Sequence, residues 1–199
     1  MTRMLLLVFV HFICCSCSDA GSTITTKDYS NKHIEALSFC KQKKFCEDYY
    51  FLVDLSIHSG KNRFYIYDFK RQKITDQNLV THGSCDIFKD NDSKYKKAAF
   101  SNLDKSHCSS LGKYKVGKRD YSSWGIKIKY WLEGLDKTNN NARKRVVVLH
   151  SWAAVADKEI FPRYSPLSWG CPAVSDNFMQ TLDTKLQETE RPVLLWIIN

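Results

Sequence analysis

The sequence has few of the features that divide a chain into separate units. It contains only 4 prolines and 8 glycines in 199 residues, and it shows no internal repeat, low-complexity block or proline-rich linker. These absences exclude a repeat array and a string of domains joined by flexible segments. The composition is 43% hydrophobic and 26% charged. It predicts one globular domain with a sizeable core, preceded by a tail.

Acidic residues are also scarce, because 21 Asp and Glu stand against 30 Lys and Arg and leave a net charge of +9. Such an excess suits a plain basic surface, or an anionic neighbour such as nucleic acid, a membrane or a cell-wall polymer. Charge alone does not choose among these. No nucleic-acid-binding motif is present, which disfavours the first of the three anionic partners.

The N-terminus lacks an apolar run of comfortable membrane-spanning length. Its run extends from Met4 to Cys15, follows a short basic start and precedes small residues that suit cleavage after Ala20. This pattern predicts a signal peptide over residues 1–20 and export to the periplasm or cell envelope. A lipoprotein signal is the alternative, with Cys15 or Cys17 carrying the lipid and attaching the protein to a membrane.

The mature chain contains no C-x2-C pair, which makes a structural zinc site the less favoured interpretation. An exported chain of this kind keeps five cysteines, so four can pair and one stays free. We expect one bond between the two that are close in sequence, a second within the loop-rich region, and a free thiol near the C-terminus. The cysteines are Cys40, Cys46, Cys85, Cys108 and Cys171.

Hydrophobic periodicity predicts a mainly β fold with a few helices. A helix is expected from Ser30 to about Lys44, with Ile34, Leu37 and Phe39 as its apolar positions, and a second helix after the N-cap-type Ser175, with Phe178, Leu182 and Leu186 at spacing four. Residues 84–110 are polar and predict a long loop. The expected strands are Tyr49–Leu55 and Arg63–Phe69 as a hairpin, 77–83, 112–117, Gly125–Trp131, Arg145–His150 and 192–198.

For two of these strands the sequence also predicts a position in the sheet. Gly125–Trp131 alternates strictly, which places Lys127 and Lys129 on the solvated face of an outer strand. Arg145–His150 is a continuous apolar run up to its last residue, so it is expected to be a central, buried strand.

Reactive residues stand at two strand ends, His150-Ser151 and Cys171. A free thiol has a pKa of about 8.5 and needs a base to attack well near neutral pH. A histidine within hydrogen-bond reach supplies that base and can later protonate the leaving group. Gly170 lets the backbone approach a substrate, and the N–H groups of Gly170 and Cys171 could face an oxyanion. Buried cysteines and strand-end histidines are common, so a packed structural thiol is the alternative.

The segments "LHS" and "LSWGCPAVS" resemble the catalytic signature of the L,D-transpeptidases, which have the YkuD-like β-sandwich fold. The nearest resemblance is to the murein L,D-transpeptidase subfamily with a Gly-Cys-Pro-Ala box. Further segments agree in the family's order, namely "FLVDLSIHSGKNRFYIYDF", "LVTHG", "FSN", "SSLGKYKVG" and "WLEGLDKTNNNARKRVVVLHS". The resemblance covers roughly Tyr49 to Ser175. It implies a domain division into 1–20 (signal), 21–48 (N-terminal helical extension) and 49–199 (catalytic domain).

The resemblance implies a role for each matching position. Cys171 would be the nucleophile, His150 its base, the Ser151 carbonyl the group that orients the imidazole, and Gly170 a part of the oxyanion hole. Substrate would be bound by His82, Gly83, Ser168 and Trp169, and Ser109-Ser110 would also line the cleft. For His82 a purely structural histidine is the alternative. His58 and His107 have no motif support and are expected to be surface or structural residues.

Two positions depart from better-known relatives, which have His or Arg before Gly-Cys and Arg two residues after the cysteine. This chain has Trp169 and Ala173 there, so the substrate carboxylates must be bound differently. Lys94–Lys97 and Arg163 are candidates for the missing charge. The chain also has Ser151 where the subfamily usually has glycine.

The implied reaction is acyl transfer on peptidoglycan stem peptides without a metal or organic cofactor. Cys171 would attack the carbonyl of the third residue of a tetrapeptide, release D-alanine and pass the acyl group to an amine, which makes a 3→3 cross-link. With water as acceptor the protein would be an L,D-carboxypeptidase. A non-catalytic wall-binding module with the same fold is the remaining alternative, although such a module need not retain Cys171 and His150.

Overall fold

The computed structural model describes residues 27–87 and 93–199, so the signal peptide, its cleavage site and the lipid-bearing cysteines predicted above lie outside the described residues. The described chain is mainly β, with eight strands and two helices, which confirms the expected fold class. No helix in this part is both long and apolar enough to cross a membrane. The elements are α1 (Ser30–Lys43), β1 (Tyr49–Asp54), β2 (Phe64–Asp68), β3 (Lys73–Asn78), β4 (Gly112–Tyr121), β5 (Ile128–Gly134), β6 (Val148–Ser151), β7 (Ala173–Val174), α2 (Asp176–Gln187) and β8 (Val193–Ile198).

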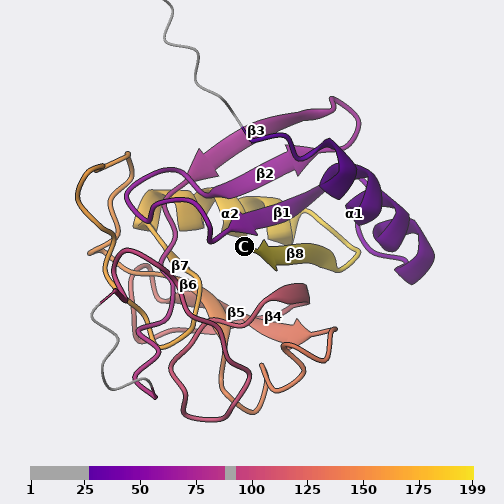
Figure 1. Ribbon diagram of the computed structural model, residues 1–199. Coiled ribbons are helices and arrows are strands. Elements are labelled where there is room, and N and C mark those ends of the chain that lie inside the picture. Colours follow the sequence, from indigo (N-terminus) through magenta and orange to yellow (C-terminus); the bar gives the residue numbers. More distant parts are fainter. Residues whose placement is uncertain (1–26, 88–92) are drawn as a thin grey trace, which may run out of the picture.

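The strands form one continuous sheet in the order β3-β2-β1-β8-β4-β5-β6-β7. The β1–β2 hairpin is confirmed, and β8 returns between β1 and β4, parallel to the first and antiparallel to the second. Figure 1 shows β1–β3 on one side of β8 and β4–β5 on the other. The inner faces of these strands and α2 enclose a single large core, so the architecture resembles a sandwich.

The strand β1 is apolar almost throughout because both of its faces are buried. Phe51 and Val53 point into the large core, whereas Tyr50 and Leu52 point to the opposite face and pack in a second cluster with α1. All four side chains are fully buried. A strand covered on both faces gains from apolar residues at every position rather than at alternate ones.

Helix α1 lies where it was expected, but its buried face is different. Ala36 and Cys40 are buried, whereas Ile34 is 68% exposed. Small residues let the helix approach the sheet closely, and this contact outweighed the apolar periodicity used for the prediction. The expected Cys40–Cys46 bond is wrong, because both residues are buried free thiols. The other expected bond, Cys85–Cys108, is present.

Three strand predictions also need correction. The strand expected over Arg145–His150 begins only at Val148, and β6 is buried but lies next to the two-residue edge strand β7 rather than at the centre of the sheet. The strand expected over 77–83 ends at Asn78, and the residues after it instead bind the segment 168–173. The strand β5 is not an outer strand, since it pairs with β4 on one side and β6 on the other. Its Lys129 is half-buried opposite His150, whereas Lys127 lies in the preceding turn at φ 65°. Alternation correctly identified the two faces, but could not reveal that another strand pairs with each edge of β5.

Helix α2 follows its sequence signals closely. Ser175 is the N-cap and its hydroxyl accepts a hydrogen bond from the N–H of Phe178 at 3.3 Å. Phe178 and Leu182 are buried in the large core, and Leu186 packs against it. The charged Asp183 on the same helix accepts hydrogen bonds from Tyr130 and Arg119, each at 2.7 Å, and so ties α2 to β5 and β4.

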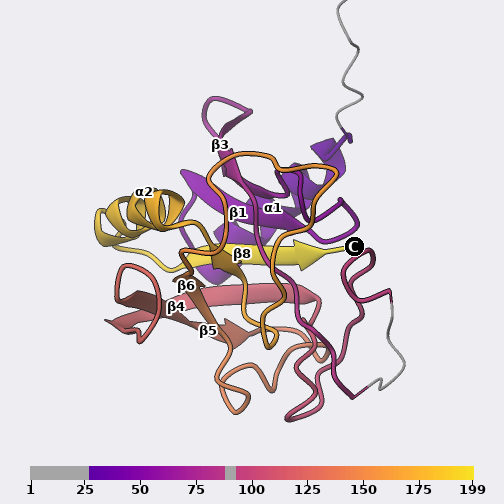
Figure 2. The ribbon, with the colours of Figure 1, turned by 90° about the vertical axis from the view of Figure 1, so that its left-hand side faces the viewer.

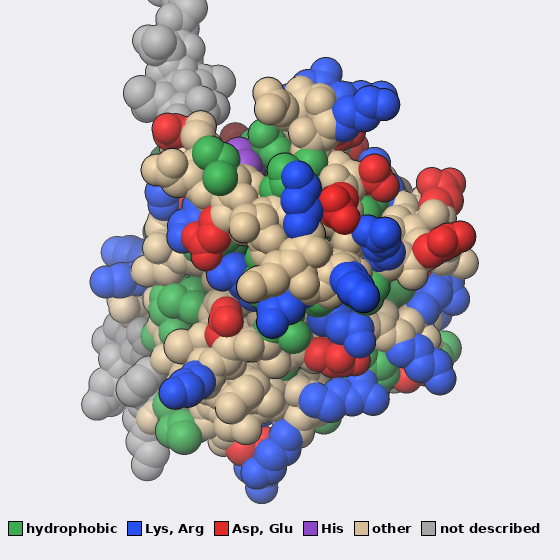
Figure 3. All heavy atoms as spheres, turned by 90° about the vertical axis from the view of Figure 1, so that its right-hand side faces the viewer, with side chains coloured by type: hydrophobic (Ala, Val, Ile, Leu, Met, Phe, Trp, Pro, Cys, Tyr) green, Lys and Arg blue, Asp and Glu red, His purple; other side chains and the backbone are tan. Residues whose placement is uncertain are grey.

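The net positive charge is dispersed on the face that Figure 3 shows. Lysine and arginine side chains are scattered there with acidic side chains between them. This arrangement keeps like charges apart and supports solubility rather than one strongly basic surface. The more localised positive charge lies in the cavity described next.

Candidate active site

Cys171 lies in the loop that leads into β7, next to the start of β6. The backbone N–H of Val148 points at its Sγ at 3.5 Å, and the Val146 carbonyl lies 3.7 Å from the same atom. Val146 itself has φ 57°, which is a strained backbone conformation for a β-branched residue. The thiol is therefore held against a constrained strand entry, at the edge of the sheet rather than in the core.

His150 belongs to β6, where it pairs in register with Ala173 of β7. Its Nδ1 lies 2.9 Å from the Ser151 carbonyl, which can only accept a hydrogen bond. The ring hydrogen therefore resides on Nδ1 and Nε2 keeps its lone pair. The Ser151 hydroxyl in turn accepts the N–H of Ile126 at 3.0 Å. This hydrogen bond gives the serine a use that a glycine at this position could not have.

The two reactive groups are both poised to be uncharged at rest. Burial lowers the pKa of His150, with the nearby Lys129 charge acting in the same direction and the hydrogen bond to Ser151 opposing it. Burial raises the pKa of the Cys171 thiol, opposed by the Val148 N–H and the charges of Arg145 and Lys129. The structure shows no hydrogen bond between the described Cys171 Sγ and the His150 ring, although both residues line the same cavities.

Gly170 occupies a position that only glycine fills without strain. Its φ is 100°, and an added Cβ would lie 2.5 Å from the Cys108 carbonyl oxygen. Its N–H donates to the Ser168 hydroxyl at 3.2 Å, so this group stabilises the loop itself. The N–H of Cys171, by contrast, makes no hydrogen bond within the described chain.

Thr81 is a supporting residue that the sequence did not single out. Its hydroxyl donates to the Cys171 carbonyl and accepts the N–H of Ala173, both at 3.0 Å. The Ser168 hydroxyl donates to the same Cys171 carbonyl at 2.6 Å. Thr81 lies in the "LVTHG" segment, whose chemistry was ascribed to its neighbours. Only the fold reveals that the threonine holds the short segment from Cys171 to Ala173.

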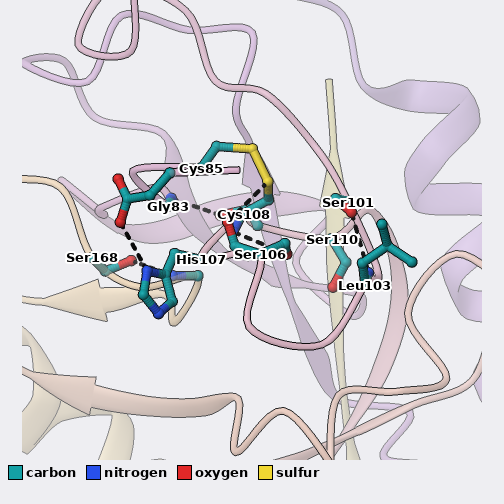
Figure 4. Close-up of a disulfide and its surroundings, with 12 residues drawn as sticks. Gly83, Cys85, Ser101, Leu103, Ser106, His107, Cys108, Ser110 and Ser168 are labelled. Atoms are coloured by element: carbon teal, nitrogen blue, oxygen red, sulfur yellow. Dashed lines mark hydrogen bonds and ion pairs between the residues drawn. A yellow bond between two sulfur atoms is a disulfide. The ribbon is translucent and has the colours of Figure 1, made fainter. Parts of the chain in front are cut away.

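The Cys85–Cys108 disulfide lies next to the cysteine loop, where the Cys108 carbonyl approaches Gly170. Arg145 donates hydrogen bonds to the Cys108 carbonyl, to the Ser101 carbonyl at 3.0 Å and to the Ser110 hydroxyl at 3.1 Å. Figure 4 shows the disulfide on the segment that carries Ser106 and His107, with Ser168 near Gly83. The arginine at the entry to β6 thus joins the disulfide loop to the strand that carries His150.

His82 and Gly83 lie behind the cysteine loop. His82 is 1% exposed, and its ring contacts Arg63 at 3.0 Å through Nδ1 and the Lys94 carbonyl at 2.6 Å through Nε2. Gly83 pairs with Ser168 and its N–H donates to the Ser109 hydroxyl at 3.0 Å. Both ring nitrogens of His82 are thus occupied by protein groups, which favours the structural alternative for this histidine.

Two cavities of about 470 and 370 Å³ meet at the reactive pair. Figure 2 shows the chain that follows β6 crossing in front of the sheet. The residues common to both cavities are Trp124, His150, Trp169 and Cys171. The smaller cavity is mostly apolar and adds Trp152, Leu167 and Ser168, whereas the larger adds the cations Lys105, Lys129, Lys144 and Arg145.

Trp169 forms an exposed aromatic platform beside the cysteine. Its side chain is 73% exposed and stacks on His107 at a centroid distance of 4.7 Å and an interplanar angle of 9°. His107 is held by Asp86 at 2.8 Å. His107 therefore has a structural task that no motif indicated. His58 stacks on Tyr164 and its Nδ1 accepts the Gly60 N–H, so it is a structural residue of another loop.

The charges proposed to replace the missing arginine are elsewhere. Neither Lys94–Lys97 nor Arg163 lines either cavity. The described residues contain no cluster of His, Cys, Asp or Glu that could hold a metal ion. The two cavities are lined by the Cys171 thiol, the His150 imidazole and the lysine and arginine side chains named above.

A family model for the L,D-transpeptidase catalytic domain matches residues 22–195. The chain belongs to this family, and the fold class and the family resemblance seen in its motifs are both confirmed. No curated protein matches the chain.

Solved structures with a similar fold come from several bacteria. One is the helical cell shape determining protein Pgp2 from Campylobacter jejuni, with 11% identity, a TM-score of 0.45, and coverage of 83% of this chain and 54% of that one. Another is Bd1075 from Bdellovibrio bacteriovorus, with 16% identity, a TM-score of 0.45, and coverage of 77% and 49%. A third is an L,D-transpeptidase from Xylanimonas cellulosilytica, with 10% identity, a TM-score of 0.41, and coverage of 80% and 68%. The chain spans about half the length of the first two.

Proposed function

We propose that this protein is an exported cysteine acyltransferase that acts on peptidoglycan stem peptides and forms 3→3 cross-links. The observation that carries the proposal is the hydrogen bond from His150 Nδ1 to the Ser151 carbonyl, at the meeting point of two cavities that both contain Cys171. This bond leaves Nε2 as the basic ring atom of a histidine that lines both cavities. A histidine retained for packing alone would need no such orientation.

In the first step, His150 Nε2 removes the Cys171 proton while Sγ attacks the carbonyl of the third residue of a stem tetrapeptide. The developing oxyanion is stabilised by the N–H of Cys171, the backbone donor that the loop leaves uncommitted. The peptide C–N bond then breaks, His150 returns the proton to the departing nitrogen, and D-alanine leaves. A thioester on Cys171 remains.

In the second step, an amine of a neighbouring stem attacks the thioester, and His150 accepts its proton. The C–S bond breaks, the Cys171 thiol re-forms, and a 3→3 cross-link results. Water in place of the amine releases a tripeptide and makes the protein an L,D-carboxypeptidase. The meeting of two cavities at one thiol supports an amine acceptor, since donor and acceptor can then approach from different sides.

The remaining residues take supporting roles in this proposal. Gly170 provides the turn that carries Cys171, and Ser168 holds that turn. Trp169 offers an apolar surface to the substrate. His82 and Gly83 act by positioning the cysteine loop from behind rather than by touching the substrate.

The same proposal includes the division of the chain and its location. Residues 1–20 direct export to the periplasm or envelope, 21–48 form an extension whose helix α1 packs on the sheet, and 49–199 form the catalytic domain. Attachment to the membrane through a lipid on Cys15 or Cys17 is the variant of this proposal that mass spectrometry of the mature N-terminus tests. An acyl-lipid mass on either cysteine establishes it, whereas an N-terminus at Gly21 establishes simple cleavage.

The test of the activity is incubation of wild type and Cys171→Ala with disaccharide-tetrapeptide muropeptides, followed by mass spectrometry. Cross-linked dimer with wild type alone establishes the transpeptidase, and tripeptide alone establishes the carboxypeptidase. The intact protein should carry an acyl adduct on Cys171. A wild type that yields no product and no adduct contradicts the proposal and favours a wall-binding module.

A further inference from the structure

Lys129 stands out among the cations of the larger cavity because of its place in the sheet. It pairs in register with His150 across β5 and β6, so both side chains point to the same face. Tyr130 and Leu132 of the same strand are directed into the core, while Lys129 lines the cavity that contains Cys171. The strand itself, rather than a loop, thus positions an ammonium group beside the catalytic base.

No ion pair within the described chain involves Lys129. Its cross-strand neighbour on β4 is Asp120, whose carboxylate accepts a hydrogen bond from Trp131 Nε1 at 2.9 Å instead. The Lys129 ammonium lies 4.9 Å from the centroid of the Trp131 ring. Asp120 also attracts the Lys129 charge across the ladder, but the two residues form no direct ion pair, so the ammonium remains available to a bound anion.

The other cations of this cavity have different surroundings. Lys144 lies 3.9 Å from Asp104, and Arg145 donates hydrogen bonds to the Cys108 and Ser101 carbonyls. Lys105 is on an exposed loop. Lys129 is therefore the cation next to His150 that lies on a rigid strand and makes no direct ion pair within the described residues.

We propose that Lys129 binds the free α-carboxylate of the amino acid that leaves when Cys171 is acylated. This inference rests on the proposed function. His150 must protonate the nitrogen of the leaving residue, and in an α-amino acid the carboxylate is attached to the carbon next to that nitrogen. A cation directly across the ladder from His150 can hold this carboxylate, and so Lys129 restricts acylation to stems whose scissile bond is followed by a single C-terminal residue.

The step balances without a change in Lys129. The C–S bond forms and the peptide C–N bond breaks, and the proton of the thiol passes through His150 to the leaving nitrogen. Lys129 keeps its proton and its charge throughout. It is thus a specificity-determining residue, and its effect belongs to one substrate group that can be removed chemically.

The test compares two tetrapeptide muropeptides that differ only at the last residue, one with a free carboxylate and one with a carboxamide. The rate measured is kcat/KM for Cys171 acylation, and the informative quantity is the acid-to-amide ratio. An ion-paired carboxylate contributes about 1.5–3 kcal/mol, which predicts a wild-type ratio of about 10–150. In Lys129→Met this ratio should fall to within about threefold of unity, an allowance for substrate differences other than the ion pair.

Two further variants separate recognition from a general disturbance of the site. Lys129→Arg keeps the charge and should retain most of the wild-type ratio. Lys118→Met, at an exposed lysine of β4 that lines neither cavity, is the matched control and should retain the full ratio. A purely electrostatic effect of Lys129 on His150 or Cys171 would slow both substrates alike and leave the ratio unchanged.

The outcomes distinguish this inference from the function on which it rests. If wild type is acylated but does not prefer the acid, or if Lys129→Met keeps the wild-type ratio, the inference is overturned while the acyltransferase stands. If wild type is acylated by neither substrate, the proposed function is overturned and the inference with it. A collapse of the ratio in Lys129→Met, with recovery in Lys129→Arg, supports the assignment.

Discussion

Removal of the Cys85–Cys108 disulfide should cost a calculable amount of stability. The bond closes a loop between residues 23 positions apart, and the loss of chain entropy predicts about 3.4 kcal/mol of stabilisation. For a domain of this size each kcal/mol corresponds to about 2–4 °C, so the melting temperature should fall by about 7–14 °C. The double variant Cys85→Ser/Cys108→Ser is the appropriate perturbation because it leaves no unpaired thiol in the loop.

The disulfide loop also supports the active site, so the same variant should have a second, smaller effect. The Cys108 carbonyl accepts a hydrogen bond from Arg145 and packs against Gly170. Backbone hydrogen bonds hold this loop independently of the disulfide, including Cys85 N–H to the His107 carbonyl at 3.1 Å. Below the new melting temperature, kcat/KM should therefore fall by less than about tenfold, since the contacts to Gly170 survive.

Thermal unfolding followed by circular dichroism, with and without a reductant, is the assay. Reductant should lower the melting temperature of wild type to that of the double variant and leave the variant unchanged. A double variant that melts within about 2 °C of wild type would refute the reasoning, because the predicted entropic loss exceeds this by a wide margin. Wild type that ignores the reductant while the variant is strongly destabilised would point to lost packing rather than to the bond.

Three further predictions follow from single sites. Gly170→Ala should lower the free energy of unfolding by about 2–5 kcal/mol and abolish most acylation, because Gly170 has a φ of 100° and an added Cβ would lie 2.5 Å from a carbonyl oxygen. The control Gly117→Ala should lower it by less than about 1.5 kcal/mol. Melting curves and the yield of the Cys171 adduct, measured for both variants, test this. Burial lowers the pKa of His82 to about 4, below its value in the unfolded chain. Up to about 3 kcal/mol of stability is therefore present above pH 6.5 and is lost as the pH falls toward 4. If the melting temperature depends on pH as steeply in His82→Gln as in wild type, this prediction is contradicted. Asp183→Asn should cost about 1.5–3 kcal/mol, since it leaves Arg119 without its carboxylate, and an unchanged urea midpoint would count against that bond.

The sequence by itself determined the local features of this fold. Period-two alternation and apolar runs located most strands, and the N-cap Ser175 with apolar residues at spacing four located α2. The segments around His150 and Cys171 identified the family, because short motifs at a strand end record chemistry that does not depend on knowing the fold. These signals operate over a few residues, so they can be read along the chain.

The tertiary structure decided how distant segments meet. It placed β5 inside the sheet, and only that order makes Lys129 a neighbour of His150. It joined Thr81 to the backbone of Cys171 and Ala173, across about 90 positions. It also decided which of the two expected disulfides forms. Cys85 and Cys108 are bonded, whereas Cys40 and Cys46 are buried free thiols.

The physical reason is that local propensity and periodicity specify which face of an element is apolar, but not what covers the other face. The local sequence does not single out Lys129 or Thr81, because a lysine on a polar strand face and a threonine in a loop are both common. Their roles depend on residues that lie far away in the sequence. Cross-strand register and loop packing supply that partner. The pair that we propose to be catalytic was thus readable from the sequence, whereas the residues that we propose to hold the loop and select the substrate depend on long-range contacts.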